Sequence, residues 1–306
     1  MITVRLLPVT AGARLNASTA RRLSREPGTA GKAGEGFHGD TMTESGGRLR
    51  STLIGALALV SAASPLACNE PAGSNPQPSE GAVRILIIGN SYLYTMDVPG
   101  IVEALAVANG DEVFVGTRTG PDMALIDHWN QGAAQQVVGS RDWDYVVLQQ
   151  GPSSVEVNRD TLRLATTLFA EHIAAARGRP ALFSAWPSMS RRQDFDRAIE
   201  SYQLAAADVA GVFLPVAPAW LEILNREPSI QLYEDELHPS QEGAYLAALV
   251  VYARLFGRSP VGLPHELTLR GGGSIRIDVP VAESLQQAAA DALADYAAQA
   301  PAREFF

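Results

Sequence analysis

From residue 83 onward, short apolar runs alternate with longer stretches in which apolar residues recur at helical spacing. The short runs are rich in β-branched residues and apolar on both faces, which predicts buried strands of a parallel sheet. We expect five strands, at residues 83–89, 112–116, 144–148, 181–185 and 211–216. We expect helices near residues 98–109, 159–177, 194–210 and 241–256. This alternation indicates an α/β fold with helices on both faces of the sheet.

The last part of the chain shows a weaker pattern. Short strands are expected around residues 265–279, and an Ala-rich helix is expected from about 282 to 299. We interpret this tail as a helical appendage that packs on the domain and carries no site residues.

A different pattern precedes residue 82. Arg48 and Arg50 stand before an apolar run at residues 53–60, which is followed by small residues. This order of charge, apolar core and small residues is typical of a signal peptide. The run is shorter than the roughly 20 apolar residues that a transmembrane helix needs. We therefore expect an exported chain.

Cys68 follows this run at the place where a lipoprotein signal carries its acylated cysteine. Pro65 departs from such signals, which usually have Leu at that position. We expect Cys68 to be the lipidation site, and the alternative is an ordinary buried or cleaved cysteine. A lipid anchor would then be the only contact with a membrane.

These patterns divide the chain into four parts. Residues 1–41 are interpreted as a misassigned start, with a disordered cytoplasmic tail as the alternative, and residues 42–67 as the signal peptide. Residues 68–81 are rich in Pro, Ser, Gly and Asn, which predicts a flexible linker. Residues 82–306 are expected to form one catalytic domain with the helical appendage.

Composition narrows the classes of function. The 306 residues are 46% hydrophobic, enough for one large core. Residues 1–50 hold 8 Lys and Arg against 4 Asp and Glu, whereas the rest holds 16 against 29. The acidic body makes nucleic acid an unsuitable partner. With one cysteine and no CxxC or HExxH pattern, we expect no internal disulfide, no metal site and no cofactor.

Two motifs carry candidate chemistry. Gly89-Asn90-Ser91 follows the first strand directly, and ligands of parallel α/β sheets bind at the carboxyl ends of strands. Asp235 and His238 lie in the loop before the helix at 241–256. In such a loop Asp235 can reach Nδ1 of His238 and leave Nε2 free as a base for a serine nucleophile. Each motif also has a purely structural interpretation. Gly89-Asn90-Ser91 would be an ordinary turn, and the segment with Asp235 and His238 would be an acidic, solvated loop.

Together the motifs resemble the SGNH, or GDSL-type, hydrolase superfamily, whose first block is Gly-Asp-Ser and whose last is Asp-x-x-His-Pro. The resemblance covers roughly residues 83–258 and is closest to a bacterial branch with a Gly-Asn-Ser first block. That branch also carries a Gly followed by a His-Trp pair and a Trp-Asp-x-Val-Val-Leu-Gln strand, matched here by Gly120, His128-Trp129 and residues 143–149. The resemblance implies a three-layer α/β/α sandwich around a mainly parallel, five-stranded, flavodoxin-like sheet.

The resemblance also implies roles for single residues. Ser91 would be the nucleophile, His238 the general base and Asp235 the residue that orients it. The backbone N–H groups of Ser91 and Gly120 would form an oxyanion hole. A side-chain amide from the third conserved block of the superfamily would complete it.

That third block departs from the usual Gly-x-Asn-Asp, because the chain reads Gln149-Gln-Gly-Pro-Ser153-Ser at this place. Gln149 is the preferred surrogate, since it keeps an amide donor at the strand end, and Ser153 is the alternative. We expect Asn90, His128 and Trp186 to line the substrate cleft. His128 could also have a structural role, and core packing is the alternative for Trp186.

The function implied is a serine ester hydrolase that acts on a small-molecule, glycan or lipid ester. One alternative is a non-catalytic, carbohydrate- or envelope-binding lipoprotein, which the altered third block would fit. Another is an O-acyltransferase that passes the acyl group to a sugar hydroxyl. The sequence gives no indication of the oligomeric state or of the particular ester.

Overall fold

The computed structural model describes residue 79 and residues 81–298. The predictions for the N-terminal tail, the signal peptide and Cys68, and nearly all of the linker, fall outside these residues. Within the described part, no helix combines the length and apolar character needed to cross a membrane.

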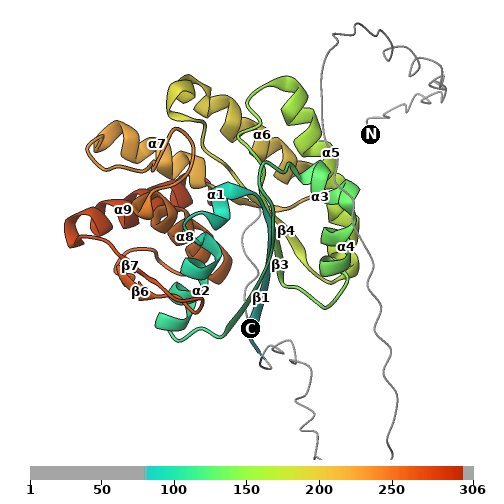
Figure 1. Ribbon diagram of the computed structural model, residues 1–306, viewed down its shortest axis with the longest axis horizontal. Coiled ribbons are helices and arrows are strands. Elements are labelled where there is room, and N and C mark those ends of the chain that lie inside the picture. Colours follow the sequence, from blue (N-terminus) through green and yellow to red (C-terminus); the bar gives the residue numbers. More distant parts are fainter. Residues whose placement is uncertain (1–78, 80, 299–306) are drawn as a thin grey trace, which may run out of the picture. The chain divides into compact units, whose positions relative to one another are not determined.

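A parallel five-stranded sheet forms the centre of the domain (Figure 1), in the order β2-β1-β3-β4-β5. Its strands are β1 (Val83–Gly89), β2 (Val113–Thr119), β3 (Tyr145–Leu148), β4 (Arg179–Phe183) and β5 (Val212–Leu214). All four strand pairings are parallel. Because β1 pairs with both β2 and β3, their carboxyl ends meet beside the segment that follows Gly89.

Two layers of helices cover the sheet (Figure 1). The short α1 (Ser91–Tyr94) directly follows β1. One layer comprises α2 (Val98–Ala108), α7 (Val216–Arg226), α8 (Gln241–Phe256) and α9 (Val279–Asp295). The other comprises α3 (Leu125–Gln131), α4 (Ala133–Val138), α5 (Glu156–Ala175) and α6 (Phe195–Asp208). The predicted three-layer α/β/α sandwich is confirmed, and its sheet is wholly parallel.

Burial of apolar side chains in the core explains why β1 forms a strand and α8 forms a helix. The side chains of β1 from Ile85 to Ile88 are at most 1% exposed, and each such burial stabilises the fold by about 1.5–3 kcal/mol. Helix α8 is buried almost throughout, which agrees with its nearly continuous apolar sequence. It begins after Ser240, whose hydroxyl accepts the N–H of Gly243, and it ends at Gly257 in the left-handed conformation.

Several boundaries differ from those predicted. Strand β2 continues through Thr119 because it is an edge strand with half-exposed residues, so its polar end was not recognised as strand. Strand β4 begins and ends two residues earlier than expected. The tail forms an antiparallel hairpin of β6 (Glu266–Thr268) and β7 (Ser274–Arg276), followed by α9, close to the predicted appendage.

Gly243 gives a test of this packing, because a Cβ there would lie 2.3 Å from the carbonyl oxygen of Leu232 and 2.5 Å from the ring of Trp220. We expect Gly243→Ala to lower the free energy of unfolding by about 1–3 kcal/mol, measured by urea denaturation. Gly271→Ala is the matched control, since an added methyl there meets nothing within 4 Å. Equal stability of the two variants would contradict the packing described.

Candidate active site

The candidate nucleophile lies in the turn that joins β1 to α1. Strand β1 ends at Gly89, and Asn90 caps α1 by accepting the N–H of Tyr92 on its side-chain oxygen, at 3.3 Å. Ser91 is therefore the first residue of the helix, at the carboxyl edge of the sheet. Its own N–H has no acceptor within α1, as is usual for the first turn of a helix.

The candidate base comes from a closed loop before α8. The N–H of Ser240 donates to the carbonyl of Leu232 at 2.9 Å, and the N–H of Glu234 donates to the carbonyl of His238 at 3.0 Å. Inside this loop, Oδ1 of Asp235 accepts the N–H groups of Leu237 and His238, each at 2.7 Å. These bonds hold the carboxylate and the imidazole in a fixed relation.

Ser91, His238 and Asp235 form one continuous chain of hydrogen bonds. Nδ1 of His238 lies 2.8 Å from Oδ2 of Asp235, and Nε2 lies 2.9 Å from Oγ of Ser91. An ionised carboxylate only accepts, so Nδ1 carries the hydrogen of a neutral ring. Nε2 then accepts the hydroxyl hydrogen of Ser91. The structure brings together the three residues that the sequence singled out, in the order that nucleophilic catalysis requires.

The carboxylate is held in its charged form. The hydrogen bond from the His238 ring, followed by the backbone N–H groups of His238 and Leu237, lowers the pKa of Asp235 from 3.8 to about 2. Asp235 therefore remains an acceptor for Nδ1 throughout the neutral and mildly acidic range. Whenever the ring is neutral, this acceptor favours the tautomer with its hydrogen on Nδ1 and the lone pair of Nε2 directed at Ser91.

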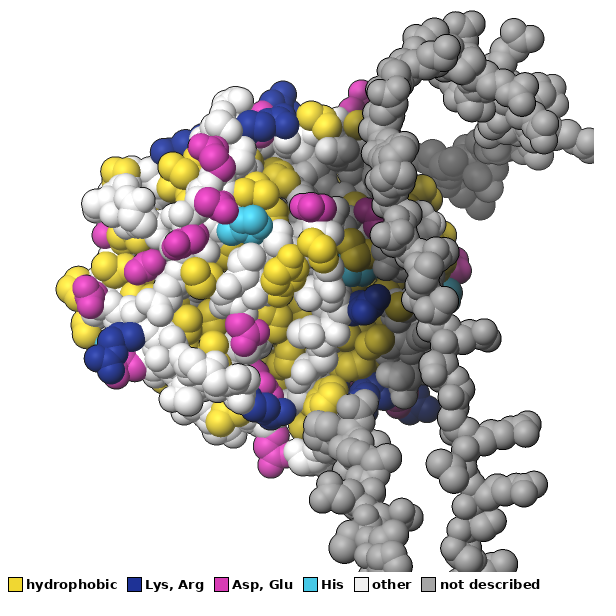
Figure 2. All heavy atoms as spheres, in the orientation of Figure 1, with side chains coloured by type: hydrophobic (Ala, Val, Ile, Leu, Met, Phe, Trp, Pro, Cys, Tyr) yellow, Lys and Arg dark blue, Asp and Glu magenta, His cyan; other side chains and the backbone are white. Residues whose placement is uncertain are grey.

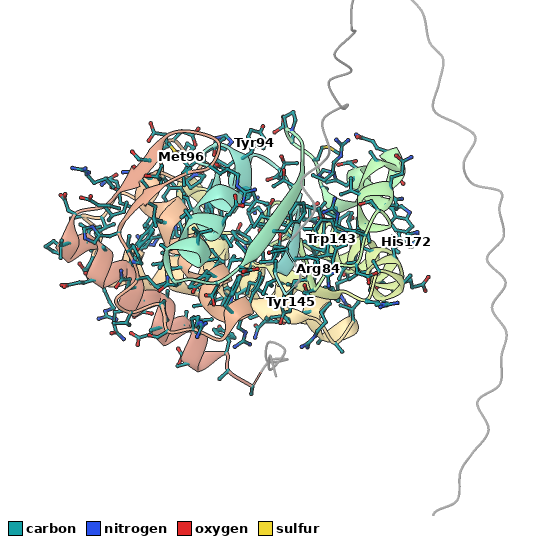
Figure 3. All side chains as sticks on the ribbon, turned by 90° about the horizontal axis from the view of Figure 1, so that it is seen from below. Arg84, Tyr94, Met96, Trp143, Tyr145 and His172 are labelled. Carbon is teal, nitrogen blue, oxygen red and sulfur yellow. The ribbon has the colours of Figure 1, made fainter. Side chains whose placement is uncertain are left out.

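Solvent and charge surround this centre. The side chains of His238 and Asp235 are 30% and 55% exposed, so water reaches the imidazole. Glu234 and Glu236, also exposed, flank Asp235 within the loop, and acidic side chains lie close to a histidine in the view of Figure 2. Tyr94 and Met96 follow Ser91 on one side of the molecule (Figure 3), and Tyr94 is 42% exposed. The surroundings are therefore acidic with apolar side chains nearby.

Two of the three predicted oxyanion donors are already engaged. The N–H of Gly120 donates to the carbonyl of Gly89 at 3.1 Å. Nε2 of Gln149 donates to Oδ1 of Asn90 at 3.1 Å and to the carbonyl of Gln150 at 2.6 Å, and the side chain is fully buried. In this conformation neither group offers a hydrogen to a substrate. The Ser91 N–H remains as a donor beside the Ser91 hydroxyl.

The alternative third-block residue does not supply a donor either. The hydroxyl of Ser153 donates to the carbonyl of Gly151 at 3.1 Å and accepts from the side chain of Gln150 at 2.8 Å. Its backbone is in the left-handed conformation, with φ of 57°, in the loop after β3. This loop is braced internally.

Two predicted cleft residues are buried instead, so their assignment as substrate-lining was wrong. His128 is 1% exposed, with Nε2 at 2.9 Å from the carbonyl oxygen of Gly89. Trp186 is fully buried and stacks on Trp220 with ring centres 3.6 Å apart. The indole N–H of Trp186 donates to the carbonyl of Leu237 at 3.0 Å, which supports the loop of His238. The sequence holds no signal for this contact. Asn90, which precedes Ser91, is also largely buried.

The charge state of Asp235 can be measured directly. We expect carboxyl-carbon NMR to give its pKa as about 2, and His238→Ala to raise it towards 3.8, because the largest cause of the lowering is lost. Since the pKa is lower in the folded chain, Asp235 stabilises the fold above about pH 4 and loses that contribution as the pH falls towards 2. An unchanged pKa in His238→Ala would show that the ring does not bind the carboxylate.

No protein-family model matches the chain, and the comparison with curated proteins finds no similar sequence. Among solved structures, a DUF4886 family protein from Bacteroides uniformis is 17% identical, with a TM-score of 0.59, over 73% of this chain and 98% of that one. A protein from Slackia heliotrinireducens, provisionally described as an SGNH hydrolase, is 26% identical, with a TM-score of 0.48, over 56% and 97% of the two chains. The likeness to the Bacteroides uniformis protein shows that the two chains share a fold.

Proposed function

We propose that the chain is a serine ester hydrolase that works through an acyl-enzyme, with Ser91 as nucleophile, His238 as base and Asp235 as the residue that orients it. The observation that carries this proposal is the hydrogen-bonded chain from Asp235 through His238 to Ser91, with distances of 2.8 and 2.9 Å. A binding protein has no need of a serine aligned on an imidazole that a carboxylate orients.

The mechanism follows from these contacts. Oγ of Ser91 attacks the ester carbonyl carbon while its proton passes to Nε2 of His238. The tetrahedral intermediate carries its negative charge on the former carbonyl oxygen, beside the N–H of Ser91. Its collapse breaks the bond to the alcohol oxygen, which takes the proton from Nε2. Water then gives a proton to Nε2 and attacks the acyl-enzyme, which releases the acid and restores Ser91.

The surroundings of the triad favour an uncharged ester. Glu234, Asp235 and Glu236 form an acidic run next to His238, which disfavours approach of an anionic substrate. Exposed Tyr94 offers an apolar ring face close to the nucleophile in sequence. We therefore propose an acetyl or short acyl ester of a neutral alcohol, such as a glycan hydroxyl, as the substrate class.

Solvent access supports hydrolysis over acyl transfer. An acyltransferase must keep water away from its acyl-enzyme, whereas the side chain of His238 is 30% exposed. Water can therefore reach Nε2 at the step in which the acyl-enzyme is cleaved.

Kinetics of nitrophenyl acetate hydrolysis test the triad. We expect Ser91→Ala and His238→Ala each to lower kcat by about 10⁴-fold or more, and the double variant to be little worse, because the two residues act as a unit. Ser140→Ala is the control, since this exposed hydroxyl only binds the carbonyl of Val137. Full activity in Ser91→Ala would refute the assignment.

We further propose that the chain is an exported lipoprotein anchored at Cys68, on the basis of the apolar run and the small residues before it. Expression in a bacterial host should give a mature chain that begins at Cys68 and partitions into detergent, and Cys68→Ser should release it. A soluble, unlipidated mature chain that begins elsewhere would disprove the anchor.

A further inference from the structure

One peptide unit, the link between Gly89 and Asn90, is bound at both of its ends. Its carbonyl oxygen accepts hydrogen bonds from Nε2 of His128 at 2.9 Å and from the N–H of Gly120 at 3.1 Å. Its N–H donates to Oε1 of Gln149 at 2.9 Å. Both lone pairs and the single hydrogen of this peptide unit are therefore used.

The bonds come from three different segments. Gly120 follows β2, His128 lies on α3, and Gln149 follows β3. Since a peptide unit is planar, fixing its oxygen and its N–H fixes the direction in which the chain leaves towards Ser91.

Gln149 holds Asn90 by a second bond as well. Its Nε2 donates to Oδ1 of Asn90 at 3.1 Å, and that same oxygen accepts the N–H of Tyr92 as the cap of α1. This pairing needs a glycine before Asn90, because a Cβ on Gly89 would lie 2.2 Å from Oε1 of Gln149. The main chain and the side chain of Asn90 are thus set by one buried amide.

His128 contributes a hydrogen bond that packing alone does not require. The carbonyl of Gly89 can only accept, so Nε2 carries the hydrogen of the neutral ring. Nδ1 is then a buried acceptor with no partner among the described residues, which costs free energy. Burial lowers the pKa of this histidine, which keeps the ring neutral. An apolar side chain would fill the same space without that cost.

We infer that His128 and Gln149 are positioning residues that clamp the Gly89–Asn90 peptide and so set where Oγ of Ser91 lies against His238. This role rests on the proposed function. Gln149, the predicted replacement for the Asn of the third block, would then hold the turn that carries Ser91 in place and would not donate to the substrate. Hydrogen bonds in so dry an environment are strong and hold geometry closely.

The test compares kcat and KM for nitrophenyl acetate in variants of the full chain. We expect Gln149→Met and His128→Phe each to lower kcat by about 10–100-fold with little change in KM, because a misplaced nucleophile slows the chemical step. His128→Gln, which can return an N–H towards the Gly89 carbonyl, should recover part of the loss. In the double variant, the fold reduction in kcat should be smaller than the product of the two single reductions, because both residues act on one peptide unit.

Gln286→Met is the matched control. Gln286 is also a buried glutamine, with bonds to Tyr245, Leu263 and Gly262, but these lie in the layer of α8 and α9. Its replacement should destabilise the fold while leaving kcat within about twofold of the parent. If Gln149→Met and His128→Phe keep the parental kcat, or lower it no more than Gln286→Met does, the clamp is refuted.

Nitrogen NMR separates the clamp from the proposed activity. His128 should appear as the neutral tautomer protonated at Nε2, and Gln149→Met should shift the amide resonance of Asn90. A parent chain without esterase activity would reject the proposed function, and these two resonances would then decide the clamp by themselves. A ring protonated at Nδ1 would overturn it.

Discussion

The hydrogen bond between His238 and Ser91 joins residues 147 positions apart, and the rest of the site depends on it. Ser91 directly follows β1, an interior strand of the sheet, whereas His238 lies in a loop that precedes a buried helix. A hydrogen bond of 2.9 Å between two such segments requires that both segments be held in fixed positions. The fold therefore has to fix two short turns at the carboxyl edge of the sheet.

Each turn is fixed from the inside of the protein. The loop of His238 is closed by backbone bonds and supported by the indole of Trp186, which is itself stacked on Trp220. The turn of Ser91 is braced by buried polar side chains that face away from solvent. Exposed groups, among them the carboxylate of Asp235, can then be solvated without loss of alignment.

Periodicity and chain order predicted much of this arrangement. Strand β1 and helix α8 have the predicted bounds, because each is bordered by a clear turn or cap signal. The short helices α1 and α4 were not predicted, since a few residues carry too little periodicity to identify a helix. Helix α7, with 11 residues, was not predicted either, and its first residue was assigned to the strand before it. The pairing of distant motifs could be anticipated because parallel strands place their carboxyl ends at one edge.

Burial and the direction of single side chains could not be predicted in this way. His128 and Trp186 carry polar atoms, and Trp186 follows a strand end, which suggested a cleft. Each instead directs its N–H to a backbone carbonyl inside the fold. The amide of Gln149 has a donor and an acceptor, and its sequence position does not say which groups they meet. These orientations depend on packing between distant segments.

Activation of the Ser91 hydroxyl by His238 is the property on which the proposed function depends. Its most direct test is reaction of the chain with a fluorophosphonate, followed by mass spectrometry of its peptides. We expect one covalent adduct, on Ser91, whose formation is abolished in Ser91→Ala and strongly slowed in His238→Ala. An adduct on another residue, or equal labelling of the parent and His238→Ala, would contradict it.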